Sequence, residues 1–387
     1  MSLTPTQQRA VDAGGNILLM AGAGTGKTHT LVERCLRCLL DPKEPAALDE
    51  ILIVTFTDAA AAEVKQRIRK RLESELRRST EAGADGGGGR RLQEQLALFE
   101  SAPIGTLHSF CFQLIREHFY ELGLDPQVAI LPEEESRLMA EEALETVLNR
   151  HYQGDTAEAA AVQALIQSQG GGWDKPVRQL LMRVHHYTQT LPDPARWLVE
   201  QTQFYAAQEP GRWQEWLHET LSDWPGRWRA FLEAQGQEIA MLFLQVLETL
   251  KTPPSLEQAR AACLEIHALR EACPKTRLKP LKSFLDEARF LGSLLEPQTP
   301  APLQQDWDWV RPQMAALLGL ARQFEAVYSE TKHELGVLDF HDLEQFALKL
   351  LWDSQTRRPT GVAEQWRKKL RYVFVDEYQD INAAQDK

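Results

Sequence analysis

The sequence predicts an α/β fold in which a parallel sheet is flanked by helices and interrupted by a large, mainly helical insertion. Apolar runs at 16–21 and 51–55 alternate with helical patterns, one of them from about 27 to 40, and this alternation is typical of parallel sheets. From about 120 to 334 the periodicity is mostly helical. The apolar run 372–375 then returns, followed by acidic residues, which indicates that the first sheet resumes after the insertion.

The 387 residues are enough for more than one domain, because single hydrophobic cores stop growing at roughly 250 residues. We expect residues 1–119 to form the first part of the sheet domain, 120–334 the helical insertion, and 335–387 the return to the sheet domain. The sheet domain is therefore expected to be discontinuous in sequence.

Two stretches rich in Gly or Pro, 83–89 and 296–302, punctuate the chain, and neither composition suits a helix or a central strand. Inside the insertion, 133–150 and 235–251 have the pattern of long amphipathic helices, and 127–131 has the pattern of a strand. The insertion is thus expected to be almost entirely helical.

Composition excludes several classes of protein. With 43% hydrophobic and 25% charged residues, the chain is ordinary for a folded protein and is not disordered throughout. No apolar run approaches the ~20 residues of a membrane helix, and the amino terminus has no signal-peptide pattern, so we expect a cytoplasmic protein with no membrane contact.

The five cysteines are scattered and odd in number, which predicts reduced thiols rather than a disulfide framework. Cys35 and Cys38 form one C-x-x-C pattern inside a predicted helix. Because no second pair of ligands lies nearby, we interpret them as core residues and assign no metal site there.

The formal charge of −12 argues against a generic basic nucleic-acid binder, so any DNA site must be a local patch. The segment 63–78 is one candidate, with seven basic residues against three glutamates, although a solvated helix face has the same composition. Six of the ten tryptophans lie between Trp173 and Trp228. Their helical spacing favours core packing over base stacking.

A phosphate-binding loop is the strongest signal in the sequence, since small residues follow an apolar run and open a predicted helix. Such a loop lets backbone N–H groups surround phosphates at the positive end of a helix dipole. Lys27 would neutralise phosphate charge, and Thr28 would hold Mg²⁺. The residues of the loop, expected to bind ATP, are Ala21, Gly22, Ala23, Gly24, Thr25, Gly26, Lys27 and Thr28.

A second carboxylate group for the metal follows the apolar run 372–375. Asp376 is expected to hold Mg²⁺, and Glu377 to orient and deprotonate the water that attacks the γ-phosphate. Acidic residues that end a strand are often merely solvated, but their pairing with an intact phosphate loop favours the catalytic interpretation.

The sequence Asp376-Glu377-Tyr378-Gln379-Asp380 resembles the Asp-Glu-x-Gln-Asp signature of UvrD/Rep-type superfamily 1 DNA helicases. The resemblance implies a P-loop, RecA-like sheet domain, called domain 1A in that family, and a helical insertion called 1B. Residues 3–11 resemble the family's glutamine motif, which implies that Gln7 reads the adenine edge. A side-chain amide can donate and accept hydrogen bonds together, as this role requires.

Two further segments resemble family motifs that line the DNA path. Residues 53–61 resemble motif Ia, which implies DNA contacts at Thr55, Phe56 and Thr57 and on the basic helix that follows, including Lys65. Residues 105–111 resemble the Thr-x-His-Ser-Phe motif, which implies contacts at Thr106 and His108. For the first segment the alternative is a buried strand end, and for the second a helix cap with an ordinary turn histidine.

The segment 338–344 and the long insertion look closest to the AddA and RecB helicase-nuclease subunits. Asp339 and Asp342 are nevertheless expected to be structural, as the two halves of a helix-capping box. Two departures stand out: His29 occupies a place where several members have arginine, and the family's motifs III to VI and second RecA-like domain have no counterpart here.

The resemblance therefore implies the amino-terminal, ATP-binding part of an ATP-dependent DNA helicase of recombination and double-strand-break repair. Its expected ligands are ATP, Mg²⁺ and single-stranded and duplex DNA, and its possible protein partner is a second helicase-nuclease subunit. The alternative is a stand-alone, ATP-dependent module that binds single-stranded DNA or a partner protein without motor activity.

Overall fold

The structure, a computed structural model, describes residues 3–22, 24–81, 88–250 and 253–387. The chain forms two compact units. Unit 1 comprises Met1–Thr146, Met182–Trp197 and Phe324–Lys387, and unit 2 comprises Val147–Leu181 and Leu198–Gln323. The predicted insertion, 120–334, therefore begins and ends within unit 1.

A small parallel sheet organises unit 1. Its order is β2 (Ile104–Thr106), β1 (Ile51–Thr55) and β7 (Tyr372–Val375), and Ile53 of β1 is in register with both Ile104 and Phe374. All five residues of β1 are buried. The predicted strands at 51–55 and 372–375 are thus confirmed, and the fold is a mostly helical α/β arrangement with a small parallel sheet.

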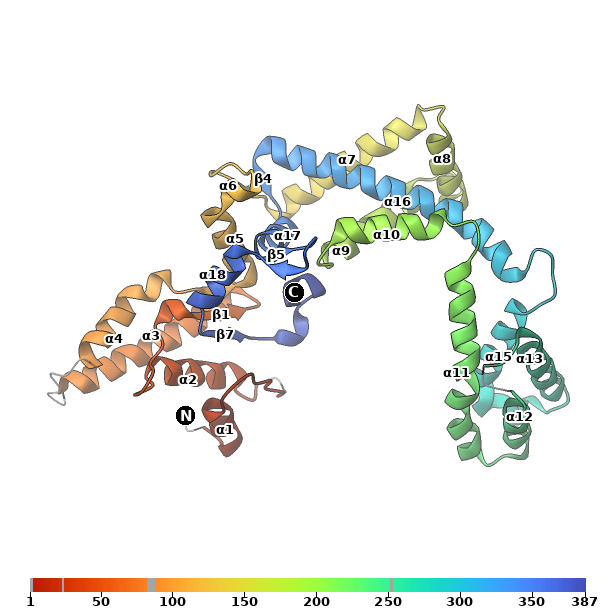
Figure 1. Cartoon of the computed structure of the whole chain (residues 1–387), viewed down its shortest axis with the longest axis horizontal. Helices are drawn as coiled ribbons and strands as arrows, with labels where there is room; N and C mark the ends of the chain where they lie inside the picture. The colour runs from red at the N-terminus through yellow and green to blue at the C-terminus, as the bar shows by residue number, and fades with distance from the viewer. Residues whose placement is uncertain (1–2, 23, 82–87, 251–252) are drawn as a thin grey trace. The chain divides into compact units, whose positions relative to one another are not determined.

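Three helices accompany the sheet: α2 (Lys27–Leu39), α3 (Asp58–Glu81) and α4 (Gly88–Ala97) (Figure 1). Apolar faces of these helices pack with the strands into one core, which includes Val32, Ile68 and Phe99. Cys35 is fully buried in this core, as the interpretation of the C-x-x-C pattern predicted.

The predicted strand at 16–21 is wrong, because these residues are irregular and belong to no strand. Leu18 is 70% and Met20 86% exposed. β7 is an edge strand of the sheet, and Val373 is 57% exposed on it. An apolar run identifies a segment that can join a sheet, but strand formation also needs a backbone partner, which local sequence does not specify.

The glycine-rich break at 83–89 is only partly tested, since 82–87 lie outside the described residues. Gly88 and Gly89 are the first residues of α4, so for these two positions the exclusion of a helix was wrong. Glycine costs about 1 kcal/mol within a helix interior but far less at its first turn, where backbone donors are free anyway.

The remaining part of unit 1 is built around the pair α5 (Leu107–Glu117) and α17 (Phe340–Leu351), which pack through Cys111, Leu114 and Leu343. Short parallel strands β3 (Ala129–Ile130), near the start of the predicted insertion, and β4 (Val337–Leu338), just after its predicted end, pair with each other. Further helices and strands of this unit are α1 (Pro5–Asp12), α6 (Phe119–Leu122), β5 (Trp352–Asp353), β6 (Arg358–Pro359), α18 (Gly361–Lys369) and α19 (Ala383–Asp386).

Four helices contain the boundaries between the two units: α7 (Glu133–Tyr152), α9 (Lys175–Gln189), α10 (Pro194–Ala206) and α16 (Pro302–Leu335). The predicted helix at 133–150 corresponds to α7. The predicted helix at 235–251 corresponds to the shorter α12 (Glu238–Glu248), because α11 ends at Gln235 and Gly236 adopts a left-handed conformation.

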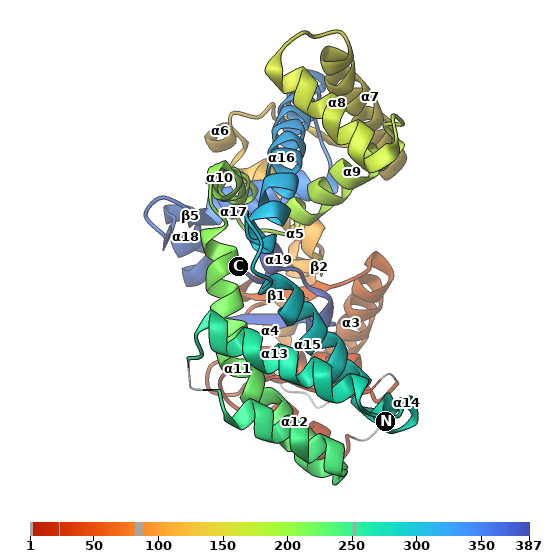
Figure 2. The same cartoon turned by 90° about the vertical axis from the view of Figure 1, so that its right-hand side faces the viewer.

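The described residues of unit 2 form helices and connecting loops but no strand, and the main core of the unit joins α11 (Gly211–Gln235), α12, α13 (Leu256–Glu271) and α15 (Lys282–Leu294) (Figure 2). Unit 2 also contains α8 (Ala157–Gly170) and α14 (Lys275–Leu278). Trp224 is fully buried against Phe284, so the core interpretation holds for this tryptophan, whereas Trp216 is 47% exposed.

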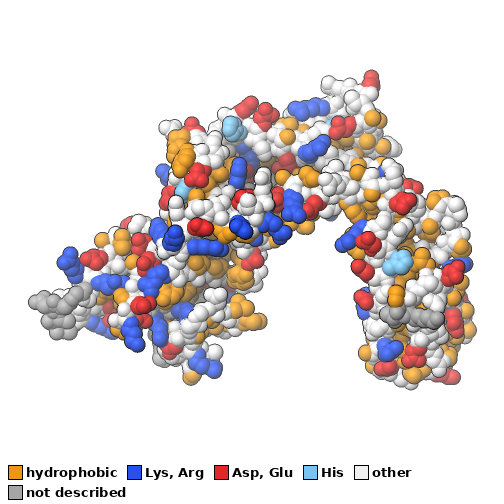
Figure 3. Space-filling model, viewed as in Figure 1, with side chains coloured by type: hydrophobic (Ala, Val, Ile, Leu, Met, Phe, Trp, Pro, Cys, Tyr) orange, Lys and Arg blue, Asp and Glu red, His pale blue; other side chains and the backbone are white. Residues whose placement is uncertain are grey.

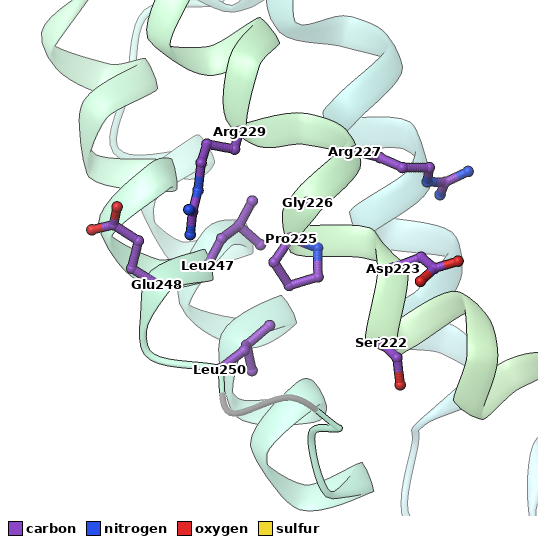
Figure 4. Close-up of a pocket in the computed structure, with 9 residues that line it drawn as sticks. All are labelled: Ser222, Asp223, Pro225, Gly226, Arg227, Arg229, Leu247, Glu248 and Leu250. Atoms are coloured by element: carbon purple, nitrogen blue, oxygen red, sulfur yellow. The ribbon is translucent and has the colours of Figure 1, made fainter.

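A hollow of about 470 Å³ lies in unit 2, where Pro225 and Gly226 interrupt the pattern of α11 (Figure 4). Leu247 and Leu250 supply apolar lining opposite Pro225, and Arg229 with Glu248 adds charge. No residue of the predicted nucleotide site lines it. Among the described residues, no helix combines the length and apolar character that crossing a membrane requires.

Candidate functional site

The phosphate loop ends in two residues with left-handed backbone. Gly24 has φ 74° and Gly26 φ 89°, and Gly26 directly precedes the first residue of α2, Lys27. The left-handed φ of Gly26 favours glycine at this position, and a Cβ there would lie 2.9 Å from the Gln7 amide nitrogen, so the Gln7 side chain would have to shift. Ala23, predicted to belong to the loop, lies outside the described residues.

Gln7 lies against this loop. Its Nε2 donates to the Thr25 carbonyl at 3.0 Å, and its Oε1 accepts from the backbone of Thr4 at 2.9 Å in the capping box of α1. Thr25 in turn donates its hydroxyl hydrogen to the Gly22 carbonyl at 2.7 Å. The glutamine segment and the phosphate loop are therefore neighbours, although both groups of the Gln7 amide are engaged within the chain.

Asp376 and Glu377 follow the last strand and meet the start of α2. The Asp376 backbone N–H donates to Val54 at 2.9 Å, which continues the pairing with β1. The Thr28 hydroxyl donates to Asp376 Oδ2 at 3.3 Å, and Lys27 Nζ lies 3.2 Å from Glu377 Oε2. Two segments about 350 residues apart in sequence thus form one charged cluster.

Glu377 has an unusual backbone and an altered acidity. Its φ of 54° is left-handed, which is uncommon for a residue with a side chain. Hydrogen bonds from Gln379 and Lys27, together with the charge of Lys27, hold the pKa of Glu377 below its ordinary value. At neutral pH this side chain is an ionised carboxylate that can accept a proton.

The residues predicted from motif Ia differ in their accessibility. Thr55 is 2% exposed and donates its hydroxyl hydrogen to the Thr57 carbonyl at 3.0 Å, so it is the buried strand end that the alternative described. The Thr57 hydroxyl accepts from the Ala60 N–H at 3.1 Å and so caps α3. Phe56 is 66% exposed, and Thr57 is exposed as well, although its hydroxyl is engaged in the cap.

The basic segment 63–78 lies on α3, and both basic and acidic side chains are seen on the surface of this part of unit 1 (Figure 3). Four arginines have carboxylate neighbours: Arg67 pairs with Glu63, Arg69 with Glu100, and Arg71 and Arg78 with Glu75. Lys65 is half-buried and, within the described part of the chain, has no ion-pair partner, as is also true of Lys70 and Arg77. These three cations remain available to an external anion.

Thr106 and His108 lie at the start of α5. The Thr106 hydroxyl accepts from the Ser109 N–H at 3.3 Å and caps the helix, as the alternative interpretation proposed. His108 Nε2 lies 3.0 Å from Glu344 Oε1, and its ring packs edge-on against Phe340 with centroids 5.3 Å apart. The histidine is therefore anchored on one side and 35% exposed.

The predicted capping box at the start of α17 is confirmed. Asp339 accepts from the N–H groups of His341 and Asp342, and the Asp342 carboxylate accepts from the Asp339 N–H. Sequence reasoning missed Lys332, which is 6% exposed and lies 2.8 Å from Asp339 and 2.6 Å from Asp342. Lys332 precedes Asp339 by seven residues, which is more than one helical turn. This spacing matches no sequence motif that would have indicated the ion pair.

Glu344, Asn382 and Gln385 were also missed. Glu344 is buried, and it accepts hydrogen bonds from both Asn382 and Gln385 as well as from His108. Asn382 and Gln385 do carry a local signal, because they form a capping box at the start of α19. Their contact with α17 has no counterpart in the sequence pattern.

Comparison with known proteins places these features in context. The model of the UvrD/REP helicase N-terminal domain family matches residues 3–387. The chain is 32% identical to the AddA subunit of the ATP-dependent helicase/nuclease of Pelotomaculum thermopropionicum and 34% identical to that of Moorella thermoacetica, in each case over 99% of the chain. The match to the protein of the same name from Listeria monocytogenes is 30% identical, again over 99%.

These matches cover 32%, 29% and 33% of the respective relatives, so the chain spans about a third of their length. The matched part includes both the phosphate loop and the Asp376–Glu377 pair, because the family model extends to residue 387.

Proposed function

Because this chain belongs to the UvrD/REP helicase N-terminal domain family, we propose that it is the ATP-binding part of an ATP-dependent DNA helicase. The observation that carries the proposal is the meeting of Lys27 with Glu377 and of Thr28 with Asp376. Folding brings together a group that neutralises phosphate, two oxygens suited to a metal, and a base, which is the set that ATP hydrolysis requires.

The residues present fit Mg·ATP. The hydroxyl of Thr28 and the carboxylate of Asp376, 3.3 Å apart, are oxygen ligands of the kind that Mg²⁺ accepts alongside water and phosphate oxygens. Gly24 and Gly26 add no side chains of their own at the entrance of α2, and a helix amino terminus attracts phosphate. Thr28 and Asp376 would hold the metal, and the loop from Ala21 to Thr28 would hold the phosphates.

Bound Mg·ATP supplies the phosphoryl group that water attacks. Lys27 would exchange its bond to Glu377 for phosphate oxygens, and the released Glu377 carboxylate would accept a proton from the attacking water. The hydrogen bond from Gln379, the largest cause of the lowered pKa of Glu377, does not depend on Lys27, so it would favour the ionised carboxylate after Lys27 has moved to phosphate. Gln7 lies next to the loop and would approach the adenine after releasing its present partners.

The names of the relatives support a wider role. Each of those compared is named as one subunit of an ATP-dependent helicase/nuclease, which implies at least one companion chain. We extend to this protein both a second, partner subunit and a role in recombination and double-strand-break repair. The fine division into domain 1A at 1–119 and 335–387 and domain 1B at 120–334 is part of the same proposal.

DNA is proposed to run over Phe56, the start of α5 and the free cations of α3. Phe56 offers an exposed ring on which a base can stack, and stacking contributes about 1–3 kcal/mol per base. Lys65 offers a positive charge without a competing carboxylate among the described residues. Thr55, Thr57 and Thr106 are engaged in internal hydrogen bonds, so we expect them to shape the path rather than to bind phosphate directly.

The experiment that tests DNA binding is a titration of labelled oligo(dT) with the chain, followed by fluorescence anisotropy at several salt concentrations. Reversing charge at Lys65, Lys70 and Arg77, the three α3 cations without an ion-pair partner among the described residues, should weaken binding and flatten its salt dependence by about 2 units of slope, since each lost single-strand phosphate contact removes about 0.7. Binding by the unaltered chain should be indifferent to base sequence, because phosphate charge and stacking carry no base code.

A matched control reverses three exposed cations elsewhere in unit 1, namely Lys349, Arg367 and Lys368. Both triple variants change the net charge equally, so a difference in oligo(dT) affinity between them must come from a local site. If the two variants lose affinity to the same extent, or if neither does at low salt, the basic part of α3 is an ordinary solvated face.

A further inference from the structure

Glu344 lies where three segments distant in sequence meet. Its carboxylate, on α17 and only 4% exposed, faces three N–H groups. His108 Nε2 lies 3.0 Å and Gln385 Nε2 2.6 Å from Oε1, and Asn382 Nδ2 lies 3.2 Å from Oε2. An ionised carboxylate only accepts hydrogen bonds, so all three neighbours must act as donors toward it.

One of the three donors, His108, belongs to segment 105–111, for which the sequence implies DNA contacts and which is called the DNA segment below. His108 is the second residue of α5, directly after the cap residue Thr106 and Leu107, and it follows the end of β2. Because its ring is 35% exposed, an external ligand can approach it while Glu344 holds Nε2 from the protein side. A phosphate that attracted the same N–H would compete with Glu344 for it.

The other two donors, Asn382 and Gln385, lie close in sequence to Glu377, the proposed base. Glu377 precedes the short 3-10 helix η4 (Tyr378–Asp380), and α19 begins three residues after η4 ends, capped by Asn382. The Ala384 N–H donates to the Thr190 carbonyl at 3.0 Å, and the Tyr378 hydroxyl to Asp386 Oδ1 at 2.5 Å. Only residues 378–382 separate Glu377 from α19. A displacement of α19 would therefore be transmitted to the left-handed backbone of Glu377.

The cluster is sensitive to the loss of a hydrogen-bond donor because the Glu344 carboxylate is a buried charge. Burial alone would raise the pKa of Glu344, but hydrogen bonds from His108, Gln385 and Asn382 hold it below its ordinary value. A buried carboxylate that loses one donor is left partly unsatisfied, and the remaining donors must compensate. A change at His108 is therefore felt at Asn382 and Gln385.

We propose that Glu344 is a positioning residue that couples occupancy of the DNA segment at His108 to the placement of Glu377 in the nucleotide site. The inference rests on the proposed function and deepens it. When a phosphate takes the His108 N–H, Glu344 keeps only the two donors of α19, and the equilibrium position of that helix and of Glu377 changes. DNA and nucleotide then alter each other's affinity, and such coupling is reciprocal.

The test is a thermodynamic coupling measurement on the chain. The Kd of Mg·ATPγS is measured with and without saturating oligo(dT), and the Kd of oligo(dT) with and without Mg·ATPγS. We expect the unaltered chain to show a change of about fivefold or more in both directions, and Glu344→Gln to reduce it to less than about twofold. The glutamine keeps the shape but presents an N–H₂ group to neighbours that are themselves donors.

Two further variants separate coupling from general damage. Gln385→Ala breaks the cluster from the α19 side, without touching α17, and should also reduce the coupling. Glu364→Gln removes the same charge from an exposed position on α18 and should leave the coupling intact. Urea unfolding of each variant compares their stability with that of the unaltered chain.

The outcomes distinguish this inference from the proposed function. If the unaltered chain binds both ligands independently, or if Glu344→Gln and Gln385→Ala both retain full coupling, Glu344 does not position Glu377 and the proposed function stands. If the unaltered chain binds no oligo(dT) or no Mg·ATPγS, the proposed function fails and the inference fails with it.

Discussion

Lys27→Ala is expected to abolish measurable binding of Mg·ATP to the chain. The Lys27 ammonium is the cation at the entrance of α2, and its removal leaves the charge of the triphosphate uncompensated there. Charge-assisted bonds to phosphate are strong, so we expect the Kd to rise at least about 100-fold, where each tenfold corresponds to about 1.4 kcal/mol. Isothermal titration calorimetry measures this directly.

Lys43→Ala is the matched control, because it removes an exposed lysine of the same unit that has no place in the proposed site. Its Kd for Mg·ATP should equal that of the unaltered chain. An unchanged Kd in Lys27→Ala would sink the assignment of the phosphate loop. Since Lys27 also pairs with Glu377, urea unfolding of both variants checks that the loss is one of binding and not of folding.

Glu377→Gln is expected to keep nucleotide binding and to remove hydrolysis by the full-length protein. The amide cannot accept a proton, and general-base catalysis typically contributes 10²–10⁴-fold, so the turnover rate should fall by about that factor. Binding persists because Lys27 loses a competing carboxylate rather than a phosphate contact. Phosphate release gives the rate, and calorimetry gives the Kd.

The pH dependence of the same reaction follows from the acidity of Glu377. A base with a lowered pKa stays ionised until the pH falls below the ordinary range of glutamate, so hydrolysis should not decline between neutral pH and that range because of Glu377.

Glu364→Gln serves as the control for Glu377→Gln and should hydrolyse ATP normally. Equal turnover in Glu377→Gln and the unaltered protein would mean that another carboxylate is the base.

Sequence alone predicted the parts of the site that local chemistry specifies. The loop before Lys27 and the carboxylates after β7 each have a composition with few other uses, and the structure places Glu377 and Asp376 within hydrogen-bonding distance of Lys27 and Thr28. Strands β1 and β7 were predicted within their observed bounds, because their apolar residues pack in one core.

The features that sequence did not predict depend on pairing between distant segments. The run 16–21 is as apolar as β1, yet it belongs to no strand, because apolarity does not name a hydrogen-bonding partner. Glu344 looked like one charge on a helix, and its burial follows only from the packing of α17 against α5 and α19. Arg69 pairs with Glu100, whereas Lys65 has no ion-pair partner among the described residues. Both observations depend on tertiary packing, which local sequence does not show.

Strand displacement tests most directly whether this chain is the ATP-binding part of a DNA motor. Unwinding of a labelled duplex and DNA-stimulated phosphate release are measured for the 387-residue chain and for the full-length protein in parallel. We expect the full-length protein to do both and the chain alone to bind Mg·ATP without unwinding, because arginines from a second motor domain contribute on the order of 10³-fold or more. Robust unwinding by the chain alone, or a full-length protein that binds DNA and ATP without either activity, would contradict this assignment.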